Sequence, residues 1–382
     1  MFMQVSMKIS DEFKKKLASY ITTAFVTLIG LAFFIKRELI FNTPILQITY
    51  DTTQYISLID GHTAPEPFAS RFLIVLLARI LPFSSIDSLY IINVISMITL
   101  ILGIYTILEN YTKIYIVKFY TILSVSLSFA FAYNFTNPYL TDMPALAALM
   151  FALIHIKKEN FTLALLFFTT SLCFRETAIV FTPLFIFFGN WKKILFAFGS
   201  VFLVYFVPKL LISGYIYSPE ILGHNPISYI IKATLSYNAL WAFPFIAIFF
   251  RPTYLDRGYI FFIAIFTLSI IGAIISSLTA MDITRMFLIM LPSIAISTCF
   301  ILNRVFILGS MNTIILLFIS ALMITIYSML PNVLSNILIA ENLEVFAKQN
   351  SMPLILGISG QVACLLIIYN RYIYLLKSDK NC

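Results

Sequence analysis

Apolar residues in this sequence form long runs, and short polar gaps separate the runs from one another. A helix that crosses the roughly 30 Å hydrocarbon core of a membrane needs about 20 mainly apolar residues. The runs therefore predict an all-α polytopic membrane protein with about twelve transmembrane helices. The expected spans are 18–35, 86–108, 115–132, 143–156, 161–174, 177–189, 194–212, 235–250, 259–278, 286–301, 305–328 and 353–370.

The charges in the gaps alternate along the chain. Lys and Arg cluster at every second gap, and most acidic residues lie in the gaps between. Basic loops are retained in the cytoplasm, so the basic gaps are assigned to the inner side. They hold Lys14–Lys16, Lys113, Lys118, Lys157, Lys158, Lys192, Lys193, Arg251, Arg257, Arg304 and Arg371. Chemistry carried by the other set of gaps is then expected on the outer side.

We expect a single transmembrane domain over 1–382. It would have a cytoplasmic N-terminal segment at 1–16, a first outer loop at 36–85 and a cytoplasmic tail at 371–382. Both termini would be inside. We predict an integral, multi-pass membrane protein. We interpret the membrane as the bacterial cytoplasmic (inner) membrane of the cell envelope.

The first outer loop contains an apolar stretch, Phe68–Leu81, that carries two cations, Arg71 and Arg79. A helix turns about 100° per residue, so these two positions share one face. Such a pattern favours a helix lying in the membrane interface, where both arginines could snorkel to headgroups. Pro82 would end it.

The region 143–189 is short for the three crossings that the charge alternation requires. Two longer crossings with Arg175 and Glu176 in mid-membrane would suit the lengths better. That alternative inverts every later loop, and it buries an arginine at a cost of roughly 3 kcal/mol. We predict three short, tilted or broken helices.

The composition agrees with a membrane protein. Hydrophobic residues make up 60% of the chain, charged residues 11%, and the mean hydropathy is +0.96. Soluble domains are nearer half apolar and a quarter charged. The net charge of +8 follows from the basic inner gaps rather than from a nucleic-acid-binding surface. The four cysteines show no CxxC spacing and suggest neither a disulfide framework nor a thiolate metal site.

Two acids stand out in the outer gaps. Asp51 lies in the segment Tyr50–Tyr55. It is either a structural acid, solvated in the loop or capping a helix in which Tyr55 packs, or a functional one. As a functional acid it would be a general base or would accept a hydrogen bond from a substrate hydroxyl. Asp142 precedes Pro144 and is a good candidate for a helix N-cap, a position from which it could also reach a ligand or metal.

Two arginines accompany them. Arg175 could be neutralised by its neighbour Glu176 at a short turn, or could bind a phosphate through its planar guanidinium. Arg285 lies three residues after Asp282, a spacing that allows an intrahelical ion pair; alternatively it is a second contact for an anionic ligand. Acids that activate a hydroxyl and cations that hold a phosphate are what transfer from a lipid phosphate requires.

The order of these segments resembles that of the GT-C superfamily of integral-membrane glycosyltransferases over about residues 15–300. Tyr50–Tyr55 resembles the family's early Asp-Glu-x-x-Tyr motif, with Thr52 in place of Glu, and Pro65–Arg71 looks like its interfacial element. The other matches are the second outer acid in Thr141–Pro144, the basic hairpin in Leu172–Ala178 and the acid-x-x-basic element in Asp282–Phe287.

The resemblance implies an inverting glycosyltransferase that uses a polyprenyl-phosphate-linked sugar as donor. The acceptor would be a lipid, a glycan or a protein at the outer face. Asp51 and Asp142 would be catalytic, and Arg175 and Arg285 would bind the donor phosphate. Tyr55, Arg71, Glu176 and Asp282 would belong to the same substrate-binding set. Asp142 is a metal ligand in metal-dependent members, so a divalent cation (Mg or Mn) on Asp51 and Asp142 is a possibility that the resemblance leaves open.

Two alternatives share the same outer residues. A flippase or transporter of lipid-linked saccharides would place polar groups nearer the midplane and would favour inverted repeats, of which the sequence shows none. A membrane-embedded glycan polymerase would use the outer face in the same way as the transferase.

Overall fold

The computed structural model describes residues 50–126, 139–213, 236–249, 257–278 and 283–307, with isolated positions between them and at 366 and 370. Every regular element in these ranges is a helix, as predicted. The first expected span, both chain termini and nearly all of the last two expected spans lie outside the described residues, so the expected number of spans remains a prediction.

Two helices in the described part are long and apolar enough to cross a membrane. One is α4 (Ser85–Leu108), and the other covers Arg257–Ser277 of α12 (Arg257–Leu278). Shorter apolar helices include α5 (Tyr115–Ser126), α8 (Phe161–Phe174) and η1 (Glu176–Phe188). These elements lie where the sequence predicts spans.

The region 143–189 forms three short helical elements, which are α7 (Asp142–Lys157), α8 and η1. The chain reverses after α7, where the Asn160 side chain caps α8 by accepting a 3.2 Å hydrogen bond from the Leu163 amide. It breaks again at Arg175, whose backbone is extended. The alternative of two long crossings with Arg175 in mid-helix is therefore wrong.

The third element, η1, is a 3₁₀ helix that contains Pro183 and ends at Gly189 in the left-handed conformation. A 3₁₀ helix rises about 2.0 Å per residue, against about 1.5 Å for an α-helix. The 13 residues of η1 can therefore extend over about 26 Å, almost the thickness of the hydrocarbon core. This length is compatible with the crossing that the sequence predicts at 177–189.

Helix α7 lies at the centre of the bundle and packs against α4 and α8. Its small residues Ala145, Ala147, Ala148 and Ala152 are buried, which allows its neighbours to come close. Gly103 of α4 faces it, and a Cβ there would lie 2.7 Å from Met150 Cγ. At the edge of the bundle, α9 (Trp191–Ser213) exposes Leu195, Phe196, Phe202, Leu203 and Leu211, as a lipid-facing helix would.

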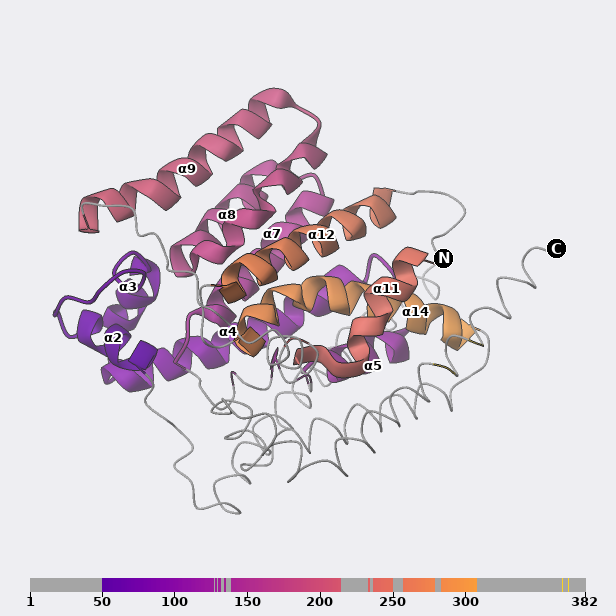
Figure 1. The fold of residues 1–382 in the computed structure, drawn as a ribbon, viewed down its shortest axis with the longest axis horizontal. Helices are drawn as coiled ribbons and strands as arrows, with labels where there is room; N and C mark the ends of the chain where they lie inside the picture. Colours follow the sequence, from indigo (N-terminus) through magenta and orange to yellow (C-terminus); the bar gives the residue numbers. More distant parts are fainter. Residues whose placement is uncertain are drawn as a thin grey trace, which may run out of the picture.

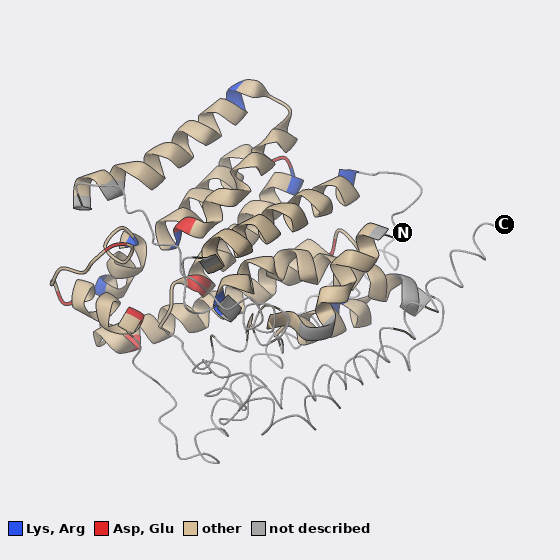
Figure 2. Ribbon diagram, viewed as in Figure 1, with Lys and Arg blue, Asp and Glu red and all other residues tan. Residues whose placement is uncertain are grey.

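The helices run back and forth between two ends of the bundle (Figure 1). At one end, α2 (Tyr50–Ile59) and α3 (Phe72–Ile80) pack with the start of α4 in a small apolar cluster around Tyr55 and Phe68. The acidic residues of α2 and α7 lie at this end, whereas the described lysines of α7 and α9 lie at the opposite end (Figure 2). The remaining described helices are η2 (Asn238–Trp241), α11 (Ala242–Phe249), α13 (Ile283–Met286), η3 (Phe287–Met290) and α14 (Leu291–Ile307).

Candidate active site

Arg285 of α13 joins two acids that are far apart in the sequence. Its Nη1 donates to Asp51 Oδ2 at 2.7 Å, and its Nε donates to Asp142 Oδ2 at 2.7 Å. Asp51 lies in the first turn of α2, and Asp142 is the first residue of α7. One guanidinium thus holds two elements of the bundle together through both of their carboxylates.

Arg175 completes this group from the break between α8 and η1. Its Nη1 forms an ion pair with the other oxygen of Asp142, Oδ1, and its Nη2 donates to Met286 Sδ at 3.0 Å. Only 6% of Asp142, 6% of Arg175 and 8% of Arg285 is exposed. Buried charges need partners, and in this group of two acids and two guanidiniums the formal charges cancel. We call Asp51, Asp142, Arg175 and Arg285 the acid–guanidinium cluster.

A second ion pair lies beside the cluster. Arg71 Nε and Nη2 donate to the two carboxylate oxygens of Glu176 at 3.0 and 2.6 Å, which is the bidentate arrangement that guanidinium favours. Arg71 Nη1 also donates to Tyr55 OH at 2.8 Å, and that hydroxyl lies 3.2 Å from Thr141 Oγ1. Since Thr141 precedes Asp142 and Glu176 follows Arg175, the two groups are held together through neighbouring backbone positions.

The break at Arg175 explains why adjacent residues have different partners. An extended residue between two helices directs its side chain away from that of its neighbour, so Arg175 reaches Asp142 while Glu176 reaches Arg71. Of the two interpretations offered for Arg175, the structure does not show direct pairing with Glu176. The structure pairs each of them with a residue from another segment.

Three further expectations need correction or stay open. Asp142 does not cap α7, because Thr141 occupies the N-cap position and the Asp142 carboxylate is engaged by two arginines. Arg71 does not snorkel to the surface; only 6% of it is exposed. Asp282 lies outside the described residues, so its expected pairing with Arg285 stays a prediction.

The environment of Asp51 keeps its carboxylate ionised. Burial raises its pKa, but the nearby guanidinium groups, Arg285 first among them, outweigh burial and leave the pKa below its ordinary value. Asp51 is therefore a weak base while it is paired with Arg285. Asp51 can accept a proton from a hydroxyl efficiently only when the Arg285 guanidinium pairs with another group instead.

A narrow pocket borders the cluster. It is lined by Asp142, Arg175, Arg285, Met286, Ser171, Thr177, Ser276 and apolar residues of α7, η1 and η3. Its volume is about 30 Å³, which is room for a water molecule but not for a sugar phosphate. A phosphate could reach the guanidiniums through this pocket only if the side chains around it moved apart.

A divalent cation does not fit between Asp51 and Asp142. The Arg285 guanidinium contacts both carboxylates, and Arg175 contacts the remaining oxygen of Asp142. A metal ion would have to displace both cations or be repelled by them. In the described part of the chain there is also no group of three or more His, Cys, Asp or Glu residues that could hold a metal.

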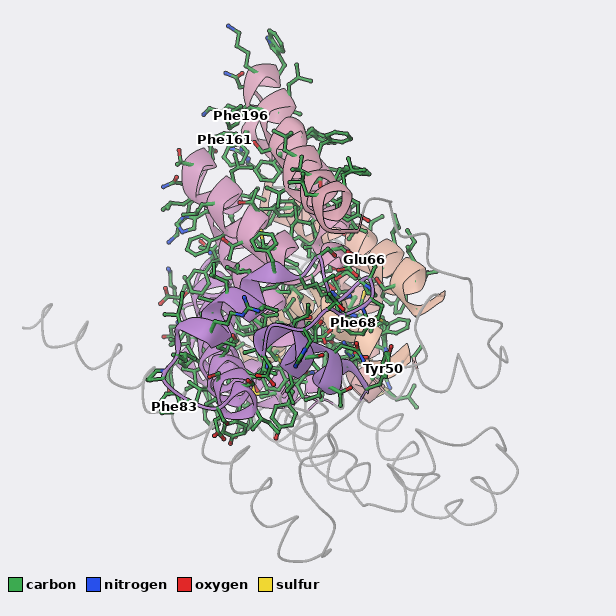
Figure 3. All side chains as sticks on the ribbon, turned by 90° about the vertical axis from the view of Figure 1, so that its left-hand side faces the viewer. Tyr50, Glu66, Phe68, Phe83, Phe161 and Phe196 are labelled. Atoms are coloured by element: carbon green, nitrogen blue, oxygen red, sulfur yellow. The ribbon has the colours of Figure 1, made fainter. Side chains whose placement is uncertain are left out.

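The sequence did not single out Glu66, which lies in the loop before α3. It is 9% exposed, and in the part of the chain that the structure describes neither of its carboxylate oxygens has a hydrogen-bond partner. Phe68, two residues on, packs edge-on against Tyr55, and the Arg71 guanidinium lies 5.7 Å from its ring centre. Figure 3 shows Glu66, Phe68 and Tyr50 along one side of this end of the bundle. A buried carboxylate without a partner is a signal that only the folded structure gives.

Comparison of the sequence with protein-family models gives no match, and comparison with curated proteins gives none either.

Proposed function

We propose that this protein is a glycosyltransferase of the GT-C type that transfers a sugar from a polyprenyl-phosphate donor to an acceptor at the outer face of the membrane. The observation that carries the proposal is the contact of Arg285 with both Asp51 and Asp142, completed by Arg175 on Asp142. Four separate segments thus bring two acids and two guanidiniums to one end of a helical bundle, where a lipid phosphate and a hydroxyl could meet.

The chemistry assigns the two kinds of side chain different tasks. In the transfer, the acceptor oxygen bonds to the anomeric carbon, and the bond from that carbon to the phosphate oxygen breaks. The bonding electrons leave with the phosphate, whose negative charge Arg175 and Arg285 would stabilise. The acceptor's proton passes to the Asp51 carboxylate.

An exchange of partners links these tasks. In the structure, Arg285 lowers the pKa of Asp51, and the adjoining pocket is too small for a sugar phosphate. When a donor phosphate binds Arg285, Asp51 loses that cation, and its oxygen becomes available to an acceptor hydroxyl. The ion pairs thus keep the guanidiniums in position before the donor arrives, and the same binding step that places the donor activates the base.

Arg71, Glu176 and Tyr55 are assigned a positioning role. Arg71 ties the loop before α3 to the start of η1, and Tyr55 lies between Arg71 and Thr141. These contacts hold Thr141 and Glu176, the chain neighbours of Asp142 and Arg175, in place. Arg71 and Glu176 pair with each other, so they add no net charge to the cluster. Their loss is expected to displace Asp142 and Arg175 rather than to remove a reacting group.

The test uses the full-length protein in liposomes with undecaprenyl-phosphate-linked glucose, mannose, arabinose and N-acetylgalactosamine, and with a bacterial membrane extract as acceptor source. The readout is release of undecaprenyl phosphate, which does not depend on the sugar. We expect the wild type to release it with at least one donor and Asp51→Asn to lose at least 100-fold in rate, within the range usual for a general base, roughly 10²–10⁴.

The matched control is Asp60→Asn, the same substitution just after the end of α2. Asp60 is exposed and accepts a hydrogen bond from Ser85 at the surface. It should keep the wild-type rate. Equal rates in Asp51→Asn and the wild type would contradict the proposal. Movement of intact donor across the bilayer without release of undecaprenyl phosphate would favour the transporter instead.

A further inference from the structure

Two adjoining cavities lie at the end of the bundle opposite the acid–guanidinium cluster. The larger, about 240 Å³, is lined by Asn110, Tyr111, Lys157, Ala247, Gly258, Tyr259, Phe262, Ile296, Ser297 and Phe300. Asp142 and Lys157 are the two ends of α7, so this cavity is about 22 Å from the acid–guanidinium cluster along that helix. It lies at the end where the described lysines of α7 and α9 are found (Figure 2).

A smaller cavity of about 100 Å³ adjoins the first. It is lined by Ile156, Lys157, Phe187, Arg257, Gly258 and Phe261, so the two cavities share Lys157 and Gly258. The Lys157 Nζ lies 3.9 Å from the centre of the Tyr111 ring and 5.9 Å from that of Phe261. Tyr111 lines one cavity and Phe261 the other. The ammonium therefore stands at the partition, held over two aromatic faces.

The described residues that line these cavities differ in charge type from those of the acid–guanidinium cluster. Of the described residues that line either cavity, none is acidic, whereas Lys157 and Arg257 are cations. Arg257 forms an ion pair with Glu159 at the exposed mouth and donates to the Phe187 carbonyl at 2.9 Å. Inside, the walls are mostly apolar and aromatic. An ammonium at the partition and a guanidinium at the mouth of a mostly apolar cavity suit an anion carried on a hydrocarbon chain.

We propose that these cavities bind a lipid phosphate from the inner leaflet, with the phosphate on Lys157 and Arg257 and the first part of its chain against Phe262 and Phe300. The larger cavity is smaller than the roughly 300–1,000 Å³ of pockets that enclose a whole ligand. This size suits a ligand that leaves most of its chain in the bilayer. The proposal is independent of the chemistry at the acid–guanidinium cluster.

The experiment is native mass spectrometry of the full-length protein in detergent, titrated with phosphatidylglycerol, undecaprenyl phosphate, phosphatidylcholine and inorganic phosphate. We expect Lys157→Gln to weaken binding of at least one of the two anionic lipids about fivefold, the factor that one lysine near an anionic surface contributes. Lys158→Gln is the matched control, because Lys158 is exposed and lines neither cavity; it should change binding less than twofold.

A second variant separates the pocket from the charge. Ala247 is 1% exposed and lines the larger cavity, so Ala247→Leu fills it without altering a cation. Ala247→Leu should weaken binding of the same lipid. Lys157→Arg, which keeps the positive charge, should bind that lipid more tightly than Lys157→Gln does. Loss with phosphatidylglycerol alone identifies a phospholipid, and loss with undecaprenyl phosphate alone identifies a polyprenyl phosphate. Three results would overturn the proposal. One is that Lys157→Gln and Lys158→Gln weaken lipid binding equally; another is that Lys157→Gln weakens phosphatidylcholine binding as much as binding of the anionic lipid. The third is that Ala247→Leu leaves lipid binding unchanged.

Discussion

Arg285 and Asp142 are 143 positions apart in the sequence, and a 2.7 Å hydrogen bond between Nε and Oδ2 joins them at one end of the bundle. The bond closes a loop that includes α7, α8, η1, α9 and α12. Because Asp142 also holds Arg175 and Arg285 also holds Asp51, loss of either residue leaves unpaired charge among buried groups. The cluster is therefore a structural junction as well as the candidate site of chemistry.

Asp142→Asn should lower the free energy of unfolding. Removing one partner from a buried ion pair costs about 3–5 kcal/mol, because the remaining charge is left without compensation. The measurement is unfolding of the purified protein in detergent. Asp87→Asn is the matched control: Asp87 is an exposed acid in the first turn of α4, and its carboxylate accepts a hydrogen bond from Ser84 at the surface. Equal losses in the two variants would show that the cluster adds no particular stability.

The Arg71–Glu176 pair should show energetic coupling. In a double-mutant cycle with Arg71→Gln and Glu176→Gln, the interaction free energy should lie at about 0.5–3 kcal/mol, as is usual for residues in direct contact. Arg71→Lys should recover little of it, because an ammonium cannot make the bidentate contact and also reach Tyr55.

Arg79→Lys provides the comparison for Arg71→Lys, since Arg79 is exposed and donates only to the carbonyls of Leu58 and Ile59. It should change stability by less than about 0.5 kcal/mol, as most surface substitutions do. Coupling near zero between Arg71 and Glu176, or a loss at Arg79 as large as that at Arg71, would refute the positioning role of this pair.

The Asp51 ion pair should stabilise the protein at neutral pH and not in acid. The pKa of Asp51 in the folded protein lies below its ordinary value of 3.8. A lowered folded pKa contributes stability above the unfolded pKa, and this contribution is lost as the pH falls through the folded value. The difference in unfolding free energy between wild type and Asp51→Asn should be constant from pH 7 to 5 and should shrink below pH 3.8. A difference that already falls between pH 7 and 5 would indicate a raised pKa.

Glu66→Gln should separate a structural from a functional carboxylate. In the described structure the buried Glu66 carboxylate has no hydrogen-bond partner, so neutralising it should stabilise the protein by roughly 1–3 kcal/mol. If Glu66 binds the acceptor, the transfer rate should fall although stability rises. A rise in stability with an unchanged rate would assign it no part in transfer, and a loss of stability would mean that it has an unrecognised partner.

Much of the fold can be predicted from the sequence because run length and charge are local properties. The apolar runs predict the helices, and the basic gaps at Lys157, Lys158, Lys192 and Lys193 favour three short elements over two long ones in 143–189, as the structure confirms. The grouping of Asp51, Asp142, Arg175 and Arg285 could also be anticipated. Exposing a charged side chain to lipid is costly, so charges in gaps on the same predicted side of one bundle are expected to pair with one another.

The pairing within the site could not be predicted. Sequence reasoning favours nearby partners, such as Arg175 with Glu176, whereas the structure pairs Glu176 with Arg71, 105 positions away. Which carboxylate a guanidinium reaches depends on where the helices break and how they pack, and neither the extended backbone at Arg175 nor the burial of Tyr55 is visible in a charge pattern. That the Glu66 carboxylate is buried with no hydrogen-bond partner among the described residues is likewise visible only in the folded chain.

In the proposed topology, the acid–guanidinium cluster opens to the outer face of the membrane and the lysine-rich end of the bundle faces inward. The most direct measurement is labelling of single cysteines by a membrane-impermeant maleimide in intact cells, after Cys173, Cys299, Cys364 and Cys382 are replaced by serine. Thr53→Cys lies two residues from Asp51 on the exposed side of α2, and Lys158→Cys lies exposed at the far end of α7. We predict labelling of Thr53→Cys in intact cells and of Lys158→Cys only after permeabilisation. Labelling of Lys158→Cys alone, or of both in intact cells, would contradict the account.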